Sequence, residues 1–164
     1  MSDQDPAAEP ADSRPFVPET FVPPAGLDHP LFRLRPLGPE HNASDYAAWT
    51  SSVEHIQATT GFEGRSWPHP MTSDENRGDL VGHAADFAAR TGFTYTVLAP
   101  TDDAPSPVIG CVYIYPAEGF DAHVRSWVRG MDASLDAVLY RTVLGWLAEA
   151  WPFERVDYAP RPGA

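Results

Sequence analysis

The chain has 164 residues, of which 43% are apolar, a length and composition that suit one globular domain. Its 23 acidic residues outnumber 11 basic residues, all of them Arg, so the net charge is −12 and no nucleic-acid partner is expected. No apolar run approaches 18 residues and the N-terminus lacks the basic and apolar segments of a signal peptide, so we expect a cytoplasmic protein with no membrane partner.

The first 28 residues differ in composition from the rest. They contain six acidic residues, six prolines and a single Arg, which is typical of a flexible leader. We therefore divide the chain into an acidic Pro/Ala-rich tail, 1–28, and a domain, 29–164. Two Phe-Val pairs, at 16–17 and 21–22, are each followed by Pro. They leave an alternative in which the pairs dock on the domain or on a partner chain.

The domain begins with a predicted strand and a predicted helix. Apolar residues alternate over 31–37, which indicates a strand. Gly38-Pro39 ends it. A helix capped by Asn42 or Ser44 is expected next. Four large apolar residues then recur at helical spacing: Tyr46, Trp49, Val53 and Ile56.

An irregular loop and a second helix follow. Residues 61–70 contain two Gly and two Pro, which break both helices and strands. The second helix is expected to begin after an N-cap at Thr72 or Ser73. We expect it to end at Gly92 in the left-handed conformation.

The second half of the domain changes to a strand pattern. Three β-rich segments, 93–98, 108–115 and 121–129, lie close together in sequence and predict an antiparallel meander. A helix over 135–151 has the widest apolar face. It connects the meander to a closing strand at 155–159, and such a crossover makes the last two strands parallel.

The resulting order, β-α-α-β-β-β-α-β, resembles the GNAT superfamily of acetyl-CoA-dependent N-acetyltransferases, in particular its short bacterial members. Residues 108–114 look like the family's third strand, 121–129 like its fourth, and 135–151 like the following helix. The resemblance implies an α+β fold, a GNAT-like mixed sheet with three helices. Family members usually continue beyond the fifth strand, so we expect a form truncated at the C-terminus. The open sheet edge is then covered by the tail or by a second subunit, as in a homodimer.

The resemblance also implies where acetyl-CoA binds. In the family its pantetheine pairs with the fourth strand, and its pyrophosphate lies at the N-terminus of the following helix, a natural anion site. The corresponding residues here are Val124, Arg125, Ser126, Trp127, Val128, Arg129 and Gly130. Asp132 and Ser134 stand where the family's phosphate loop has Gly or Ala. A second interpretation of this loop is that Asp132 or Ser134 is only the N-cap of the helix.

Amine acetylation needs a base for the ammonium group and an acid for the leaving thiolate. His123, with a side chain that titrates near neutral pH, is the first candidate base, and Glu63 is the second. Tyr158 is a candidate acid, in place of a Tyr that the family carries further along the chain. A solvated strand end is the competing interpretation of His123. The residues expected near the acceptor are Phe62, Arg65, Trp67, His69, Tyr113 and Tyr115, several of which could instead only pack.

The sequence thus predicts an N-acetyltransferase that moves acetyl from acetyl-CoA to a primary amine of a small molecule or peptide. The six histidines show no ligand-pair spacing, so no metal is expected. The alternative is a catalytically silent GNAT-like domain that binds a ligand or acts as a dimeric interaction module. Asp132 and the expected truncation favour this alternative.

Overall fold

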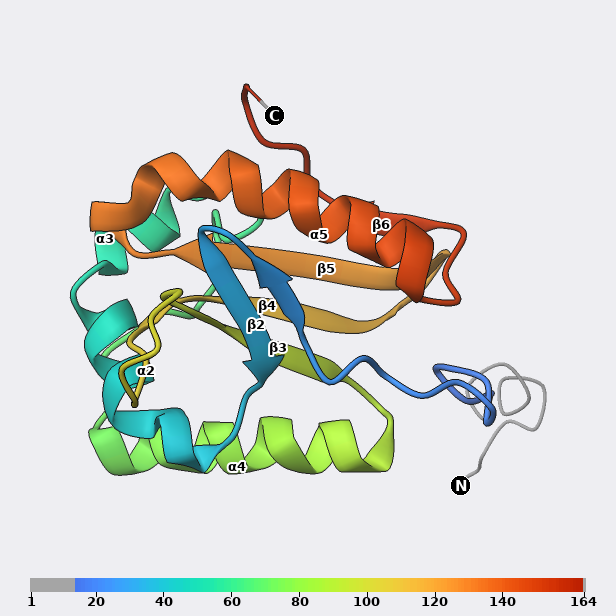
Figure 1. The fold of residues 1–164 in the computed structure, drawn as a ribbon, viewed down its shortest axis with the longest axis horizontal. Coiled ribbons are helices and arrows are strands. Elements are labelled where there is room, and N and C mark those ends of the chain that lie inside the picture. The colour runs from blue at the N-terminus through green and yellow to red at the C-terminus, as the bar shows by residue number, and fades with distance from the viewer. Residues whose placement is uncertain (1–13, 164) are drawn as a thin grey trace.

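A six-stranded sheet with helices on both faces forms the centre of the computed structural model, which describes residues 14–163 (Figure 1). The strands lie in chain order: β1 (Leu27–His29), β2 (Phe32–Pro36), β3 (Phe93–Leu98), β4 (Val108–Ala117), β5 (Phe120–Val128) and β6 (Val156–Tyr158). All neighbours are antiparallel except β5 and β6, which are parallel. The predicted meander, the parallel crossover and the α+β class are therefore confirmed.

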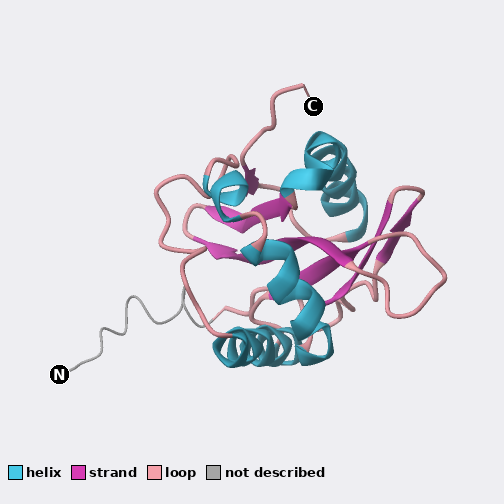
Figure 2. Cartoon of the chain, turned by 90° about the vertical axis from the view of Figure 1, so that its left-hand side faces the viewer, coloured by secondary structure: helices cyan, strands magenta, loops and turns pink. Residues whose placement is uncertain are grey.

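The helices divide between the two faces of the sheet (Figure 2). One face carries α2 (Asn42–Thr50), α3 (Val53–Gln57) and α4 (Ser73–Ala89), and the other carries α5 (Asp136–Ala150). Short 3-10 turns precede α2 and α5, η1 (Pro39–His41) and η2 (Gly130–Leu135). No helix within residues 14–163 combines the length and apolar character needed to cross a membrane.

Successive side chains of the central strands point to opposite faces of the sheet, and this alternation produces two apolar cores. On β4 and β5, Cys111 and Trp127 point toward the α2–α4 side, where Trp49 and Phe62 pack with them. The intervening residues Val112, Ile114, Val124 and Val128 point toward α5. They form the larger core with residues of that helix, Leu139, Val143 and Leu147. Strand β4 is therefore buried on both faces over its first five residues, as expected for its nearly continuous apolar run.

The strand expected over 31–37 is β2, and the first predicted helix is subdivided. Strand β1, which was not predicted, precedes β2 and pairs with it in a hairpin whose turn exposes Leu31. The first helix is interrupted between α2 and α3, where Ser51 Oγ donates to the Ala48 carbonyl. The expected caps are wrong, because the Asn42 and Ser44 side chains bond to residues far away in the chain and do not cap the helix. Asn42 Nδ2 donates to the Ser73 carbonyl, and Ser44 Oγ accepts from Val108 N.

Helix α4 starts as predicted and ends differently. Thr72 Oγ1 accepts from Glu75 N at 3.1 Å, while Glu75 Oε1 accepts from Thr72 N, a complete capping box. The left-handed residue at its end is Arg90, with φ 65°, so the expectation for Gly92 is wrong. Gly92 serves another purpose, because a Cβ there would overlap the Tyr115 ring.

The described part of the N-terminal segment packs against the domain. Val17 is 2% exposed, and the Phe16 ring stacks on Phe93 and Phe153. Phe21 contacts the Trp151 ring. These contacts correspond to the docked alternative for the Phe-Val pairs. Residues 1–13 of the expected flexible tail lie outside the described residues, and the domain boundary at residue 28 and the second subunit stay predictions.

Candidate functional site

A pocket of about 450 Å³, here called the central pocket, lies between α4, the loop after α3 and the exposed ends of side chains on β4 and β5. It combines aromatic walls with several charged groups. Its lining consists of Leu37, Asp45, Phe62, Trp67, Asn76, Asp79, Leu80, His83, Asp86, Tyr113, Tyr115 and Arg125. Aromatic surface with a few converging polar groups is the usual make-up of a small-molecule site.

A buried carboxylate forms one end of the central pocket. Asp45 is 4% exposed, and burial raises its pKa to about 6. Asn76 Nδ2 donates to Asp45 Oδ2 at 3.0 Å, which opposes that rise, and the charge of Asp79 adds to it. Within residues 14–163 no cation lies within ion-pair distance of Asp45. The carboxylate therefore favours a positively charged ligand.

A hydrogen-bonded chain of three side chains forms a second wall. Tyr115 donates its hydroxyl hydrogen to Asp86 Oδ2 at 2.9 Å. His83 Nδ1 lies 2.8 Å from the same Tyr115 oxygen and 3.1 Å from Thr94 Oγ1. Because Tyr115 gives its one hydrogen to Asp86, Nδ1 is the donor in the contact with Tyr115. This leaves the lone pair of a neutral imidazole on Nε2. Burial lowers the His83 pKa, which keeps the ring neutral at pH 7.

Arg125 supplies the positive charge of the central pocket. Its guanidinium carbon lies 5.2 Å from the Phe62 ring centre and 5.6 Å from the Tyr113 ring centre, close enough for cation–π contacts. Burial lowers its pKa, and the nearby charge of Arg65 does so further. Its Nε is buried without a hydrogen-bond partner among the described residues. No carboxylate of residues 14–163 lies within ion-pair distance of it.

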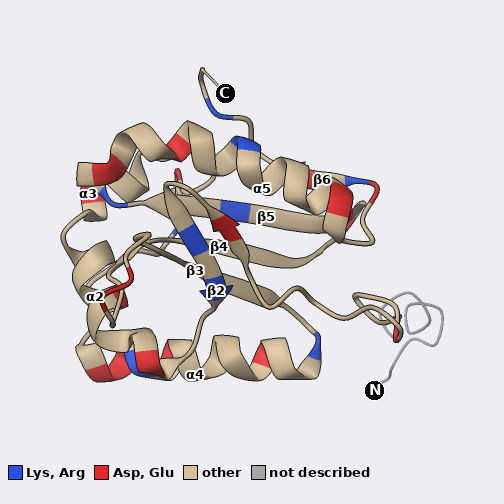
Figure 3. Ribbon diagram, in the orientation of Figure 1, with Lys and Arg blue, Asp and Glu red and all other residues tan. Residues whose placement is uncertain are grey.

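Local periodicity explains why these groups converge. Asn76, Asp79, His83 and Asp86 occur at helical spacing on α4 and so share one face. Figure 3 shows the acidic residues distributed along that helix. Tyr113 pairs with Arg125 across β4 and β5, which places both on the pocket side of the sheet.

The structure divides the residues predicted at the acceptor site into two groups. Phe62, Trp67, Tyr113 and Tyr115 line the central pocket, and so does Arg125, which had been assigned to the cofactor. Two others, Arg65 and His69, are exposed in the loop and do not line it, and neither does the candidate base Glu63. Glu63 accepts from Gly61 N, Arg65 donates to the Gly61 carbonyl, and the His69 ring contacts the Pro70 carbonyl.

The two remaining catalytic candidates also lie outside the central pocket. His123 Nδ1 donates to Asp157 Oδ2 at 2.9 Å across the β5–β6 pair, and its Nε2 is buried without a partner among the described residues. The Tyr158 hydroxyl is buried 2.6 Å from Ser126 Oγ, and burial raises its pKa. Tyr158 therefore keeps its proton at neutral pH.

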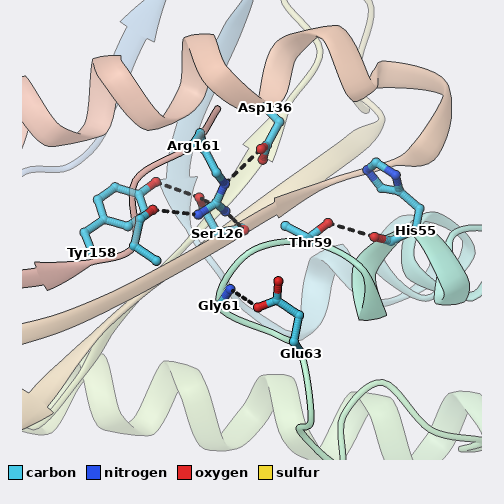
Figure 4. Close-up of polar contacts among 9 residues, drawn as sticks. His55, Thr59, Gly61, Glu63, Ser126, Asp136, Tyr158 and Arg161 are labelled. Atoms are coloured by element: carbon cyan, nitrogen blue, oxygen red, sulfur yellow. Dashed lines mark hydrogen bonds and ion pairs between the residues drawn. The ribbon is translucent and has the colours of Figure 1, made fainter. Parts of the chain in front are cut away.

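Beyond the last β5–β6 pair, Val124 with Tyr158, lies the space that we call the wedge. Figure 4 shows the Arg161 side chain inserted there from the C-terminal segment. It donates to the Ser126 carbonyl at 2.6 Å, to Asp136 Oδ2 at 2.8 Å and to the Ala159 carbonyl at 3.0 Å. Its side chain is 2% exposed, so it fills the wedge.

The loop before α5 also has its polar groups engaged. Arg129 Nε donates to Asp132 Oδ2 at 2.7 Å, and Gly130 N donates to Ser52 Oγ at 2.9 Å. The expected N-cap role of Asp132 or Ser134 is wrong, because α5 begins at Asp136 and its cap position, Leu135, makes no side-chain bond. The Arg129–Asp132 pair neutralises the charge that an anion would meet.

These contacts test the fit of acetyl-CoA to the residues predicted for it. The Ser126 carbonyl on the wedge side of β5 is bonded to Arg161, and Gly130 N is bonded to Ser52. The side chains of Val124, Ser126, Trp127 and Val128 are buried in the cores. While Arg161 holds this position the wedge is closed to acetyl-CoA, and it can admit a ligand only after Arg161 leaves it.

Five polar pocket residues were not predicted from the sequence: Asp45, Asn76, Asp79, His83 and Asp86. For the four on α4 the signal is the helical spacing of polar residues beside the apolar stripe, whereas Asp45 lies on α2. That spacing indicates a shared face, although it does not say whether the face is solvated or covers a pocket.

No protein-family model matches the chain, and no curated protein matches it. Solved structures do. A ribosomal-protein-S5-alanine acetyltransferase from Vibrio fischeri has a TM-score of 0.63 at 13% identity, over 85% of this chain and 76% of that one. RimL, a ribosomal L7/L12 acetyltransferase solved with coenzyme A, has a TM-score of 0.57 at 12% identity, over 76% of this chain and 66% of that one. MccE, a microcin C7 self-immunity acetyltransferase solved with acetyl-CoA and AMP, has a TM-score of 0.56 at 10% identity, over 80% of this chain and 69% of that one. At these identities the likeness shows the fold.

Proposed function

We propose that this chain, whose fold is that of the GNAT acetyltransferases, transfers an acetyl group to a primary amine of a small molecule or peptide. The observation that carries the proposal is the central pocket, in which the buried Asp45 and the neutral His83 lie within one cavity. The pocket is lined by the loop between the helices, which is where the family resemblance implies the acceptor. Acetyl-CoA is the proposed donor, because similar solved structures hold coenzyme A or acetyl-CoA.

The residues of the pocket have two roles in this proposal. Most primary amines are protonated at neutral pH, so Asp45 and Asp79 would attract the ammonium group. His83 would take one proton from it through Nε2, because Nδ1 is held by Tyr115 and Asp86 orients Tyr115. Because the pKa of His83 lies below 7, the imidazole accepts this proton only from an ammonium group bound close to it.

A specific observation favours the alternative function, a domain that binds an amine without turnover. Arg161 fills the wedge with four hydrogen bonds, and Asp132 is paired with Arg129 in the loop expected to hold phosphate. If these contacts persist, the pocket retains its ligand-binding groups while no donor can approach it.

The deciding experiment is calorimetric titration of the full chain with acetyl-CoA, followed by measurement of amine-dependent thiol release. Binding at micromolar concentration with thiol release supports acetyl transfer. Failure of both the unmodified protein and Arg161→Ala to bind at millimolar acetyl-CoA, with both folded by circular dichroism, overturns acetyl transfer and leaves the binding domain.

A variant pair tests the base. His83→Gln should lower kcat at least tenfold, since Gln cannot take up a proton at neutral pH. His29→Gln, at the opposite edge of the sheet in β1, serves as the control and should keep the rate. Equal rates for His83→Gln and the unmodified protein would exclude His83 as the base.

A further inference from the structure

We infer that the ligand of the central pocket carries a carboxylate as well as an amine, so that the acceptor class is a small apolar α-amino acid. The inference rests on the proposed function in that it names the acceptor, although ligand binding by itself can test it. It starts from two opposite charges that line one cavity, neither of which has an ionic partner among residues 14–163.

Arg125 is the first of these charges. The Phe62 and Tyr113 rings hold its guanidinium group in place, yet no side chain or carbonyl of residues 14–163 accepts a hydrogen bond from it. A half-buried guanidinium group has lost part of its hydration and retains its charge. Its planar array of donors matches a carboxylate, with which it forms two parallel hydrogen bonds.

Asp45 is the second charge. The Asn76 amide is its hydrogen-bond donor at 3.0 Å, and Asp79 adds negative charge nearby rather than neutralising it. A ligand ammonium group would compensate this end of the pocket. A ligand with only an amine would leave Arg125 unpaired beside Arg65, and one with only a carboxylate would leave Asp45 unpaired.

The pocket walls between the charges indicate the rest of the ligand. Leu37, Leu80 and Trp67 supply apolar surface in the same cavity of about 450 Å³. An apolar side chain on the ligand would be buried there, while its two charged groups meet Arg125 and Asp45. A small apolar α-amino acid combines all three features in one molecule.

The test is calorimetric titration of the full chain without acetyl-CoA. Leucine, phenylalanine and methionine are each compared with the matching amine that lacks the carboxylate and the matching acid that lacks the amine. At least one amino acid should bind tenfold or more tightly than both of its partners. Overturning results are no preference within any of the three sets, or no binding of any amino acid at millimolar concentration.

Variants locate the preference. Arg125→Gln should remove the advantage of the amino acid over its decarboxylated amine, and Asp45→Asn should remove its advantage over the deaminated acid. Arg141→Gln, on the exposed surface of α5, is the matched control and should keep both advantages of the amino acid. Unfolding curves check that each variant is folded. Because the comparison within the unmodified protein already decides the inference, a variant that fails to fold does not weaken the test.

Failure of this inference is distinguishable from failure of the proposed function. Selective amino-acid binding without thiol release upholds the inference and supports the binding domain. Acetylation of amines regardless of a carboxylate upholds acetyl transfer and overturns the inference.

Discussion

Asp45 and Arg161 are both charged and buried, and the protein stabilises them differently. Arg161 has a carboxylate partner in Asp136 and two backbone carbonyls, so its charge is compensated inside the fold. Asp45 has a single amide donor, so its ionised form is left uncompensated. The first arrangement is typical of a structural ion pair and the second of a ligand site.

The raised pKa of Asp45 predicts a pH dependence of stability. Between roughly pH 4 and 6 the folded state keeps a proton that the unfolded chain, with a pKa near 3.8, has lost. Stability should therefore fall as pH rises through this window, by up to about 3 kcal/mol. Urea unfolding at several pH values should show this fall in the unmodified protein and its absence in Asp45→Asn. The control Asp103→Asn, in an exposed loop, should retain the fall.

The Arg161 contacts predict a large effect of truncation. Arg161→Ala leaves Asp136 and the Ser126 carbonyl without their donor and should cost about 3 kcal/mol in urea unfolding. Arg141→Ala removes an exposed Arg and should change the free energy of unfolding by less than about 0.5 kcal/mol. Similar costs for the two variants would contradict the assignment of Arg161 as a buried partner of Asp136.

At the scale of elements, helix α4 brings two of the four charged residues, Asp79 and Asp86, and the His83 imidazole to the central pocket. Its start is determined locally by the Thr72–Glu75 capping box. Its end is followed by Gly92, which leaves space for the Tyr115 ring that bonds to Asp86 and His83. The start of α4 thus fixes where the helix forms, and the glycine after its end lets Tyr115 reach Asp86 and His83 in the pocket.

The capping box gives a prediction for this helix. Thr72→Ala removes the acceptor of Glu75 N and should lower the free energy of unfolding by about 1 kcal/mol. Thr72→Ser keeps the hydroxyl and should stay within a few tenths of a kcal/mol of the unmodified protein. Chemical unfolding of the three proteins checks the order of their stabilities. An equal loss of stability in the Ser variant would show that the hydroxyl does not supply the cap.

At the scale of the whole molecule, the N-terminal segment extends the larger core. Phe16 and Val17 join the apolar side chains of β3 and of the segment after α5, and Tyr95 Oη donates to the Pro24 carbonyl at 2.7 Å. A segment whose composition is typical of a leader therefore acts as a cover for the end of the sheet. Burial of three apolar side chains, Phe16, Val17 and Phe21, holds the segment on the domain despite its leader-like composition.

Two identical substitutions test this cover. Val17 is 2% exposed and Val22 is 80% exposed. Val17→Ala should lower the free energy of unfolding by about 2 kcal/mol, because it removes buried methyl groups and leaves a cavity. Val22→Ala should have almost no effect. Equal unfolding midpoints for the two variants would show that the segment does not contribute to the core in solution.

The sequence by itself determined the order of the elements from β2 onward apart from the break between α2 and α3, the antiparallel meander, and an α4 cap at Thr72 or Ser73, of which the structure has Thr72. These features depend on periodicity and on bonds within four residues, which one sequence displays directly. Only the tertiary structure decided that Asp45, His83 and Arg125, from three separate elements, share one pocket, and that Arg161 fills the wedge. Such contacts join residues far apart in the chain, so no local pattern encodes whether a polar side chain meets solvent, a partner or a ligand.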